Sequence, residues 1–340
     1  MADYNYMFND KLYKKKYHDV DISSSSFLIT GGAGFIGSNI VEYLLKNRAG
    51  KVRVLDNLSN GYFENIKDFL SFSNFEFIEG DIRSIDTCRE AIKNIDFVSH
   101  QAALGSVPRS ISDPILSNEV NVNGFLNILT SIKDSASVKR FVYAASSSTY
   151  GDSKQLPKVE GNEGNVLSPY AVTKVVNELY ADVYSKVYGL NSIGLRYFNV
   201  FGPKQNPNNP YAAVIPLFCK HFIENTTPKI FGDGLTSRDF TFVENVVQAN
   251  IRSLFYPDLG KHEVFNVACG DEITLIKIVN LLKEICGVNL NPVFFDERKG
   301  DVKHSKASID KISKIGYVPE IFFEEGLEMV YNWYKNNEIQ

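Results

Sequence analysis

The chain has 340 residues, 44% of them hydrophobic and 22% charged, which is the composition of a folded globular protein. Because single hydrophobic cores stop growing near roughly 250–300 residues, this length predicts one large α/β unit with an appended lobe, or two domains. Lys and Arg total 36 against 40 Asp and Glu, a net charge of −4. This balance gives no sign of a nucleic-acid partner or of binding to an anionic membrane surface.

Cysteines, histidines and apolar runs narrow the class of protein further. The five histidines are scattered, and the widely spaced cysteines form no C-x-x-C pair, so we expect neither a disulfide scaffold nor a metal site. Residues 1–20 are polar and contain three consecutive lysines, unlike a signal peptide. The longest apolar runs, such as Ala212–Cys219, are far shorter than the about twenty residues of a membrane span. We therefore expect a soluble protein of the reducing cytoplasm with no membrane partner.

The first segment, residues 1–26, is an N-terminal extension rich in aromatic residues and lysine that ends in four serines. We expect a surface helix or an arm that caps the domain or a subunit contact. From Phe27 onward, short apolar segments alternate with helix-length stretches such as Phe35–Lys46 and Asn118–Ile132, whose apolar residues recur every three or four positions. The strand candidates are Phe27–Thr30, Val52–Leu55, Phe75–Ile78, Phe97–His100, Arg140–Ala144 and Ser192–Arg196. This alternation predicts an α/β fold with a doubly wound parallel sheet covered by helices on both faces.

A glycine-rich loop follows the first predicted strand. Gly31, Gly34 and Gly37 allow a tight turn, close approach of a pyrophosphate to the backbone amides, and close packing of helix on strand. The helix that follows offers unpaired N–H groups and the positive end of its dipole to that pyrophosphate. Asp56 ends the second strand, where a carboxylate would accept hydrogen bonds from an adenosine ribose, although it could also simply cap a turn. The pattern predicts a Rossmann-type dinucleotide-binding unit.

The acidic side chain at position 56 would repel a 2′-phosphate, so NAD is preferred over NADP as the cofactor. Lys51 and Arg53 lie close to it and weaken this preference. Residues 80–82 and 101–103 follow the third and fourth strands, at the sheet edge where ligands of open α/β sheets bind. Each segment either contacts the cofactor or forms a plain strand-to-helix turn.

The pattern Y-x-x-x-K occurs three times, and context separates the three copies. Tyr170 and Lys174 follow the helix-start signal Ser168-Pro169 and lie one turn apart on one helix face, whereas the other two copies fall in a loop and near the C-terminus. Oxidation of a secondary alcohol needs a base, and a nearby ammonium favours the phenolate of a tyrosine whose pKa is otherwise about 10. Ser146, after the fifth strand, offers a hydroxyl to hold the substrate oxygen.

The regular alternation of strand and helix patterns ends after Val200, where turn-forming Gly, Pro and Asn residues are frequent. We expect residues 27–200 to form the NAD-binding unit, to which residues 239–270 return. Residues 201–238 and 271–340 would form a smaller mixed α/β lobe that binds the substrate.

Together these features resemble the extended short-chain dehydrogenase/reductase superfamily, in its nucleotide-sugar epimerase/dehydratase branch, over roughly residues 27–335. The bacterial UDP-N-acetylglucosamine 4-epimerases look most similar. The segments that carry the resemblance are Gln101–Ser110, Ala144–Gly151, Leu195–Gly202, Ser237–Phe240 and Arg298–Asp301.

The resemblance implies a role for each matching residue. It implies that Tyr170, Lys174 and Ser146 are catalytic. The cofactor would contact Gly31, Gly34, Phe35, Ile36, Gly37, Asp56, Asn57, Asp81, Ile82, Gln101, Ala102, Ala103, Tyr170, Lys174 and Tyr197. The UDP-sugar substrate would contact Gly105, Ser106, Ser146, Ser147, Asn199, Ala213, Val214, Arg238, Arg298, Asp301 and Ser305. An arginine fork suits a diphosphate, although Arg238 and Arg298 could also form surface ion pairs.

Two departures from relatives narrow the expected reaction. Dehydratases of this branch carry acidic residues after the catalytic hydroxyl residue, where this chain has Ser147 and Ser148. Hexose-restricted epimerases have a bulky tyrosine where this chain has Ser305, which leaves room for an N-acetyl group unless Ser305 is only a turn residue. We expect interconversion of UDP-N-acetylglucosamine and UDP-N-acetylgalactosamine through a 4-keto intermediate with tightly bound NAD.

Other functions remain open on the same residues. A 4-epimerase of UDP-N-acetylglucosaminuronate or UDP-glucuronate would need the same machinery. A net oxidoreductase would release reduced cofactor, and a non-catalytic dinucleotide sensor would have no need of the Tyr–Lys pair. The resemblance also implies a homodimer through a four-helix bundle of Asn118–Ile132 and Tyr170–Lys186 from each subunit.

Overall fold

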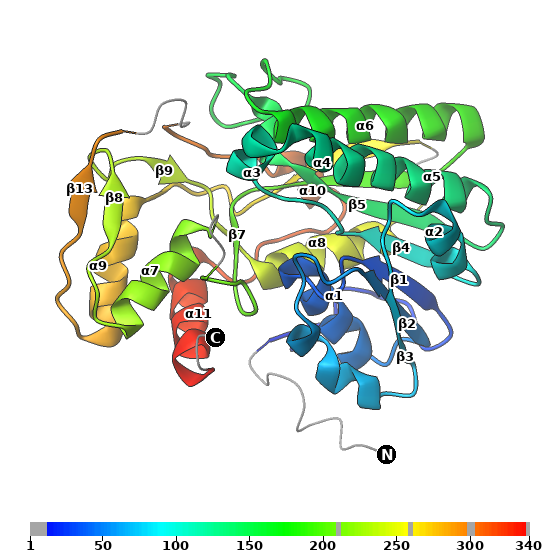
Figure 1. The fold of residues 1–340 in the computed structure, drawn as a ribbon, viewed down its shortest axis with the longest axis horizontal. Helices are drawn as coiled ribbons and strands as arrows, with labels where there is room; N and C mark the ends of the chain where they lie inside the picture. The colour runs from blue at the N-terminus through cyan, green and yellow to red at the C-terminus, as the bar shows by residue number, and fades with distance from the viewer. Residues whose placement is uncertain (1–11, 209–211, 258–260, 298–302, 338–340) are drawn as a thin grey trace.

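The computed structural model describes residues 12–208, 212–257, 261–297 and 303–337. Its centre is a seven-stranded sheet in the order β11-β6-β5-β4-β1-β2-β3, in which every pair of neighbours is parallel (Figure 1). The strands are β1 Ser26–Thr30, β2 Lys51–Asp56, β3 Phe75–Glu79, β4 Phe97–His100, β5 Arg140–Ser146, β6 Ser192–Tyr197 and β11 Glu263–Val267. The predicted doubly wound parallel sheet is confirmed, and each predicted strand is present.

Helices cover both faces of this sheet, as predicted. On one face lie α1 (Phe35–Lys46) and α8 (Val243–Phe255), which pack on each other and on the central strands. On the other face lie α2 (Ile85–Ile92), α5 (Phe125–Lys133) and α6 (Pro169–Tyr188). Each face has its own cluster of buried apolar side chains. Both faces of the sheet are therefore dry, which explains the nearly continuous apolar runs of its strands.

The predicted helix Asn118–Ile132 differs in detail from the structure. The chain is helical from α3 (Val107–Ser112) through α4 (Pro114–Asn118) and a π-helical segment, Glu119–Gly124, before α5 begins. Short 3-10 helices occupy Phe63–Asn65, Lys67–Ser71 and Ser147–Tyr150. Among these pieces, the π-helical segment faces the cavity described below, because Val120 is one of its lining residues.

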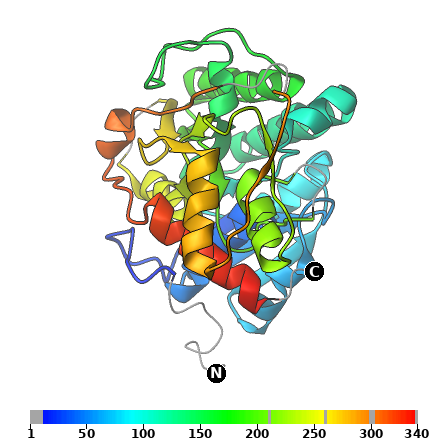
Figure 2. The same cartoon turned by 90° about the vertical axis from the view of Figure 1, so that its left-hand side faces the viewer.

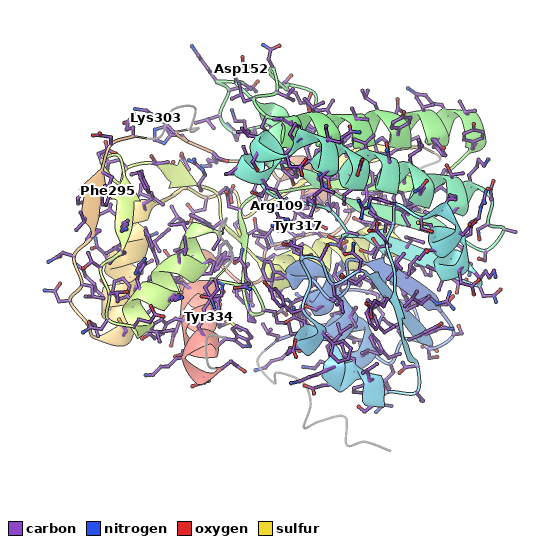
Figure 3. The ribbon with its side chains drawn as sticks, in the orientation of Figure 1. Arg109, Asp152, Phe295, Lys303, Tyr317 and Tyr334 are labelled. Carbon is purple, nitrogen blue, oxygen red and sulfur yellow. The ribbon has the colours of Figure 1, made fainter. Side chains whose placement is uncertain are left out.

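The remaining elements form a lobe beside the sheet, at the left of Figure 1. Helices α7 (Val214–Ile223), α9 (Leu275–Cys286) and α11 (Phe323–Asn336) pack against one another, as Figure 2 shows. Two-stranded pairs join β8 (Lys229–Phe231) to β13 (Val293–Phe295) and β9 (Ser237–Arg238) to β12 (Ile273–Thr274). Phe295 lies on this lobe, far from the sheet (Figure 3). The pair β7 (Val200–Phe201) with β10 (Thr241–Phe242) and the short helix α10 (Asp310–Ser313) complete the fold.

Residues 12–22, which we call the N-terminal arm, contain no helix. Four of their apolar side chains are nevertheless fully buried: Leu12, Tyr13, Tyr17 and Ile22. Figure 2 shows the arm in dark blue on the outside of the molecule. Within the described part of the predicted extension, residues 12–22 form an arm packed on the domain, while residues 1–11 lie outside the described residues.

The described residues contain neither a membrane-spanning helix nor a cluster of metal ligands. No helix in this part of the chain is long and apolar enough to cross a membrane. No group of three or more His, Cys, Asp or Glu side chains within the same residues could hold a metal ion.

Candidate active site

A cavity of about 490 Å³ opens at the carboxyl ends of the central strands. Ligands of open α/β sheets bind at this edge, and the volume lies in the range of small-molecule sites. All of the predicted cofactor contacts line it: Gly31, Gly34, Phe35, Ile36, Gly37, Asp56, Asn57, Asp81, Ile82, Gln101, Ala102, Ala103, Tyr170, Lys174 and Tyr197. The structure therefore brings together residues from strands β2 and β6, from the loops that follow β1 to β4, and from helices α1 and α6.

The glycine loop approaches neighbouring backbone so closely that side chains would not fit at two of its positions. Gly31 has a φ of 68°, and a Cβ atom there would lie 2.6 Å from the amide nitrogen of Ala102. A Cβ atom on Gly37 would overlap the carbonyl oxygen of Gly31. Helix α1 starts after Gly34, which provides no side-chain cap, so the N–H groups of its first turn are left to a ligand. These features fit the pyrophosphate of a dinucleotide.

Asp56 lies at the end of β2, where its carboxylate accepts two backbone hydrogen bonds. Its Oδ2 accepts from the amide of Ala33, in the glycine loop, and its Oδ1 from the amide of Leu58, both at 2.9 Å. Burial raises the pKa of this carboxyl, and the two amides oppose that rise. Because each carboxylate oxygen can accept more than one hydrogen bond, Asp56 both closes the turn and keeps capacity for a ribose hydroxyl. The two interpretations of this residue are compatible.

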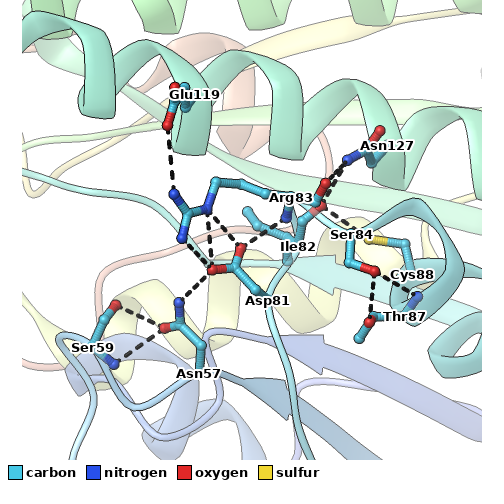
Figure 4. Close-up of polar contacts among 10 residues, drawn as sticks. All are labelled: Asn57, Ser59, Asp81, Ile82, Arg83, Ser84, Thr87, Cys88, Glu119 and Asn127. Atoms are coloured by element: carbon cyan, nitrogen blue, oxygen red, sulfur yellow. Dashed lines mark hydrogen bonds and ion pairs between the residues drawn. The ribbon is translucent and has the colours of Figure 1, made fainter.

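A second carboxylate, Asp81, anchors a polar cluster at the far end of the cavity (Figure 4). It accepts hydrogen bonds from the guanidinium of Arg83 at 2.7 Å and from the side-chain amide of Asn57 at 3.0 Å. Hydrogen bonds from Arg83 lower the pKa of Asp81 to about 2, so it is ionised at neutral pH. Arg83 also pairs with Glu119 at 3.5 Å. The cluster fixes Asn57 and Asp81 in the cavity wall.

Tyr170, Lys174 and Ser146 converge at the other end of the cavity. The Ser168 hydroxyl caps α6 by accepting from the amide of Ala171, which places Tyr170 in the first turn. Lys174 donates to the carbonyl of Ala144 at 2.7 Å, and its Nζ lies 5.9 Å from the centre of the Tyr170 ring. The carboxyl end of β5 therefore holds the lysine, and the same strand supplies Ser146.

Burial and neighbouring groups set the protonation states of Tyr170 and Lys174. Burial raises the pKa of Tyr170, and its hydrogen bond with Ser146 lowers it. Burial lowers the pKa of Lys174 to about 8, and the negative charge of Glu178 opposes that shift. Arg196 on β6 pairs with Glu178 at 2.7 Å and so ties α6 to the sheet one turn beyond Lys174. At neutral pH the lysine is charged and favours the phenolate of Tyr170.

Two functional neighbours were missed by sequence reasoning. Asn250 of α8 donates to the hydroxyl of Tyr197 at 2.8 Å and accepts from the side-chain amide of Gln101 at 3.1 Å, which fixes the cavity floor. Asn121 of the π-helical segment bonds both backbone groups of Leu104, at 2.8 and 3.2 Å. It also donates to the hydroxyl of Thr173 on α6 at 3.2 Å. No local sequence motif identifies either asparagine as functional, because the residues that each one contacts are distant in sequence.

The predicted substrate residues fall into three groups. Gly105, Ser146, Ser147, Asn199 and Ala213 line the cavity. Four further residues are not among those that line the cavity. Ser106 caps α3, Val214 begins α7 and Arg238 ends β9. Ser305 is half-buried and lies two positions after Lys303, which Figure 3 labels. Arg298 and Asp301 lie outside the described residues. The contacts of all of these residues with substrate stay predictions.

Asp239, next to Arg238, is a further residue whose role the sequence did not reveal. Its buried carboxylate accepts from the backbone amides of Cys269, Gly270 and Ala307 at 3.0 to 3.1 Å. Its carbonyl accepts from the side chain of Asn199 at 2.9 Å. Burial raises its pKa to about 7, against the effect of these amides. Asp239 thus joins two further segments, at Cys269–Gly270 and at Ala307, to Asn199 in the cavity wall.

Comparison with known proteins agrees with this geometry. The sequence pattern of the NAD dependent epimerase/dehydratase family matches residues 27–268. The chain belongs to this family. The resemblance noted from the motifs is thereby confirmed, the protein is an enzyme of the epimerase type, and NAD is the cofactor of the family.

Relatives of this chain cover nearly its whole length. A UDP-glucose 4-epimerase of Mycolicibacterium smegmatis is 34% identical over 91% of this chain and 98% of its own. The solved structure of a UDP-N-acetylglucosamine 4-epimerase from Methanobrevibacter ruminantium, in complex with UDP-N-acetylmuramic acid, is 37% identical. It has a TM-score of 0.86 and covers 92% of this chain and 98% of that one. A UDP-glucuronic acid 4-epimerase from Bacillus cereus, bound to UDP-glucuronic acid and NAD, has a TM-score of 0.85 at 30% identity, covering 92% and 99%.

Proposed function

We propose that the protein is a 4-epimerase of UDP-sugars that acts on UDP-N-acetylglucosamine and UDP-N-acetylgalactosamine. The observation that carries the proposal is the convergence of Tyr170, Lys174 and Ser146 in the same cavity that the glycine loop and Asp56 line. A dinucleotide sensor would have no need of this trio, which therefore speaks against a purely regulatory role. The 4-epimerase activities named for several relatives support the same reaction class.

The side chains of this site can perform the proton transfers of the reaction. The Tyr170 phenolate removes the proton of the sugar 4-hydroxyl, while the Ser146 hydroxyl holds the same oxygen. Lys174 keeps its positive charge beside the phenolate and lowers the cost of forming it. After the 4-keto sugar has rotated and presents its opposite face, Tyr170 returns the proton to the oxygen at C4. Bound NAD supplies the oxidation at C4 and the reduction that reverses it, so no external oxidant is consumed.

The choice of sugar is the finer part of the proposal. The family resemblance places Ser305 where hexose-restricted epimerases carry a tyrosine, and its small side chain favours an N-acetylated substrate, although Ser305 is not among the residues that line the cavity. Uronic-acid sugars are the second candidate, because a UDP-glucuronate 4-epimerase of Thermodesulfobacterium geofontis is 34% identical over 92% of this chain.

The proposed enzyme is a homodimer of the cytoplasm. Apolar side chains are exposed along α6 and on the neighbouring helices: Ile111, Ile115, Val172, Leu179, Val183 and Val187. Those on α6 recur at helical spacing and form one stripe, and α3 to α6 lie together at the top of Figure 1. A stripe of this kind supports pairing with the same face of a second copy. The four cysteines are unpaired thiols, as in a reducing compartment.

The decisive experiment is incubation with UDP-N-acetylglucosamine, UDP-glucose and their uronates, without added NAD, followed by separation of the C4 epimers. We expect the N-acetylglucosamine compound to turn over fastest. Tyr170→Phe, loaded with NAD to the same extent, should be slower by roughly 10²–10⁴-fold, the usual contribution of a positioned acid–base group. If none of the four sugars changes, or if Tyr170→Phe is as fast as the natural protein, the proposal is wrong.

A further inference from the structure

The N-terminal arm precedes the residues that match the family pattern and runs along one face of α1. The carbonyl of Leu12 accepts from Lys46 at 2.7 Å, and the amide of Tyr17 donates to the hydroxyl of Tyr43 at 2.7 Å. The hydroxyl of Tyr13 donates to Oδ1 of Asn39 at 2.5 Å. Positions 39, 43 and 46 lie about one turn apart on one side of the helix. The contacts of the arm therefore extend along α1 from Lys46, in its last turn, to Asn39, one turn after the start of the helix.

Asn39 is the point at which the arm meets the cofactor site. Its side-chain amide donates to the carbonyl of Phe35, in the first turn of α1, at 2.8 Å. The same amide donates to the carbonyl of Pro203 at 3.2 Å. Asn39 is fully buried, and with Tyr13 in place its oxygen and both of its N–H groups have partners. One side chain thus connects the arm, the glycine-loop helix and the segment 202–206.

That segment forms part of the cavity wall. Lys204, Gln205 and Asn206 all line the cavity. Lys204 pairs with the buried Glu42 of α1 at 2.7 Å, and Asn206 donates to the hydroxyl of Tyr62, in the loop that follows β2. Segment 202–206 therefore spans from α1 to the loop beyond Asp56, along the region that fits the dinucleotide. These contacts hold segment 202–206 in place as one part of the cavity wall, beside the first turn of α1.

We propose that the N-terminal arm is a cofactor-retention element, in which Tyr13 acts through Asn39 to hold segment 202–206 and the first turn of α1 around NAD. Tyr13 is a positioning residue, since none of its contacts reaches the cavity. Without its hydroxyl, the buried Oδ1 of Asn39 loses its donor, which favours conformations in which Asn39 releases Phe35 and Pro203. This inference concerns NAD, the cofactor of the family, and does not depend on which sugar is the substrate.

The arm also provides a matched control. Tyr17 is as deeply buried as Tyr13, its ring stacks on Tyr43 at 5.5 Å, and its hydroxyl donates to Glu244 of α8 at 2.8 Å. Its hydroxyl has no bond to Asn39. Replacing either tyrosine by phenylalanine removes one buried hydroxyl hydrogen bond of the arm, and only one of the two changes touches Asn39.

The test measures release of bound NAD from the full-length protein into buffer that contains an NAD-consuming enzyme. We expect Tyr13→Phe to speed release on the order of tenfold, as for the loss of one buried hydrogen bond, and Tyr17→Phe to leave the rate near that of the natural protein. In the Asn39→Ala background, Tyr13→Phe should add nothing, because its partner is already gone. Unchanged release in Tyr13→Phe, or equal acceleration by both tyrosine variants, would overturn the proposal.

A second measurement uses the unaltered chain. Coupling is reciprocal, so if the arm retains NAD, bound NAD must stabilise the arm. We expect the amides of Tyr13 and Tyr17 to exchange hydrogen more slowly in NAD-loaded than in NAD-stripped protein. The amides of α9 serve as the control, because they report any change in the stability of the whole protein. Equal exchange of the arm amides in both forms would contradict the proposal. Neither measurement uses a sugar, so a failed epimerase assay leaves both interpretable.

Discussion

A buried tyrosine becomes a base only through its neighbours. Burial alone raises the pKa of Tyr170, which would leave the phenol protonated at neutral pH. Ser146 lowers this pKa through a hydrogen bond, and the Lys174 ammonium lies near the same ring. Lys174 is itself held by the carbonyl of Ala144. The basicity of the site therefore depends on a charge that the end of β5 keeps in place.

This arrangement makes the pH dependence of Lys174→Met predictable. Without the ammonium the phenolate is less stable, so the pKa of Tyr170 rises further. We expect the rising limb of log(kcat/KM) against pH to shift to higher pH in the NAD-loaded variant. In the natural protein, the ammonium supports the phenolate fully only well below the pKa of Lys174, which is about 8; half of this support is lost at that pH, and the rest declines above it.

The control for this measurement is Lys154→Met, which makes the same change in a second Y-x-x-x-K pattern. Lys154 is exposed, and its partner in that pattern, Tyr150, donates its hydroxyl to Asn266 at 2.7 Å. We expect the profile of Lys154→Met to superimpose on that of the natural protein. A superimposable profile for Lys174→Met as well would remove Lys174 from the mechanism.

Single residues also show what the sequence could and could not predict. The catalytic trio and the cofactor contacts follow strand ends or a helix start, so local sequence predicted that they gather at one edge of the sheet. Asn250, Asn121 and Asp239 act through backbone or side-chain partners 17 to 149 positions away. Nothing in the residues around an asparagine or an aspartate specifies partners at that distance. These roles needed the folded chain.

At the scale of elements, the glycine loop is the least tolerant part of the cofactor site. Gly37→Ala would place a methyl group against the carbonyl of Gly31, which is backbone and has no freedom to rotate away. We expect the purified variant to contain much less NAD than the natural protein and to have a lower Tm. Both quantities can be measured on the same sample, by release of nucleotide in acid and by thermal unfolding.

Gly105→Ala is the control, because a Cβ atom on Gly105 meets nothing within 4 Å. Gly105 also lines the cavity, so both variants make the same Gly→Ala change in the wall of the same cavity. We expect its NAD content and Tm to stay at the values of the natural protein. If both variants lose NAD to the same extent, the close approach at Gly37 is not what limits binding.

Elements with strong local patterns were predicted well, and elements defined by tertiary contact were not. The central strands are continuous apolar runs, and α1 has the predicted bounds, Phe35–Lys46. The π-helical segment Glu119–Gly124 has an ordinary helical pattern, so its altered hydrogen bonding could not be read from residue types. The exposed pair β8 and β13 consists of three-residue strands whose pairing depends on the lobe around them.

At the scale of the whole molecule, the apolar stripe on α6 predicts a change of oligomeric state. Leu179 is 61% exposed on this stripe, and Leu70, in the 3-10 helix Lys67–Ser71, is 52% exposed elsewhere. We expect Leu179→Glu to yield monomers, because burial of a carboxylate between two apolar faces is costly, and Leu70→Glu to remain dimeric. Sedimentation velocity distinguishes the two outcomes. Dimers of Leu179→Glu would place the subunit contact on another face.

The path of the chain through the sheet has a consequence for its synthesis. Strand β11 pairs with β6, but the chain builds α7, β8 and α8 between these two strands. While the ribosome is still producing that stretch, β6 is an open edge with unpaired backbone groups, and such edges recruit other chains. The nascent protein therefore exposes the edge of β6 after this strand has emerged, and this exposure of β6 ends when β11 leaves the exit tunnel and pairs with it.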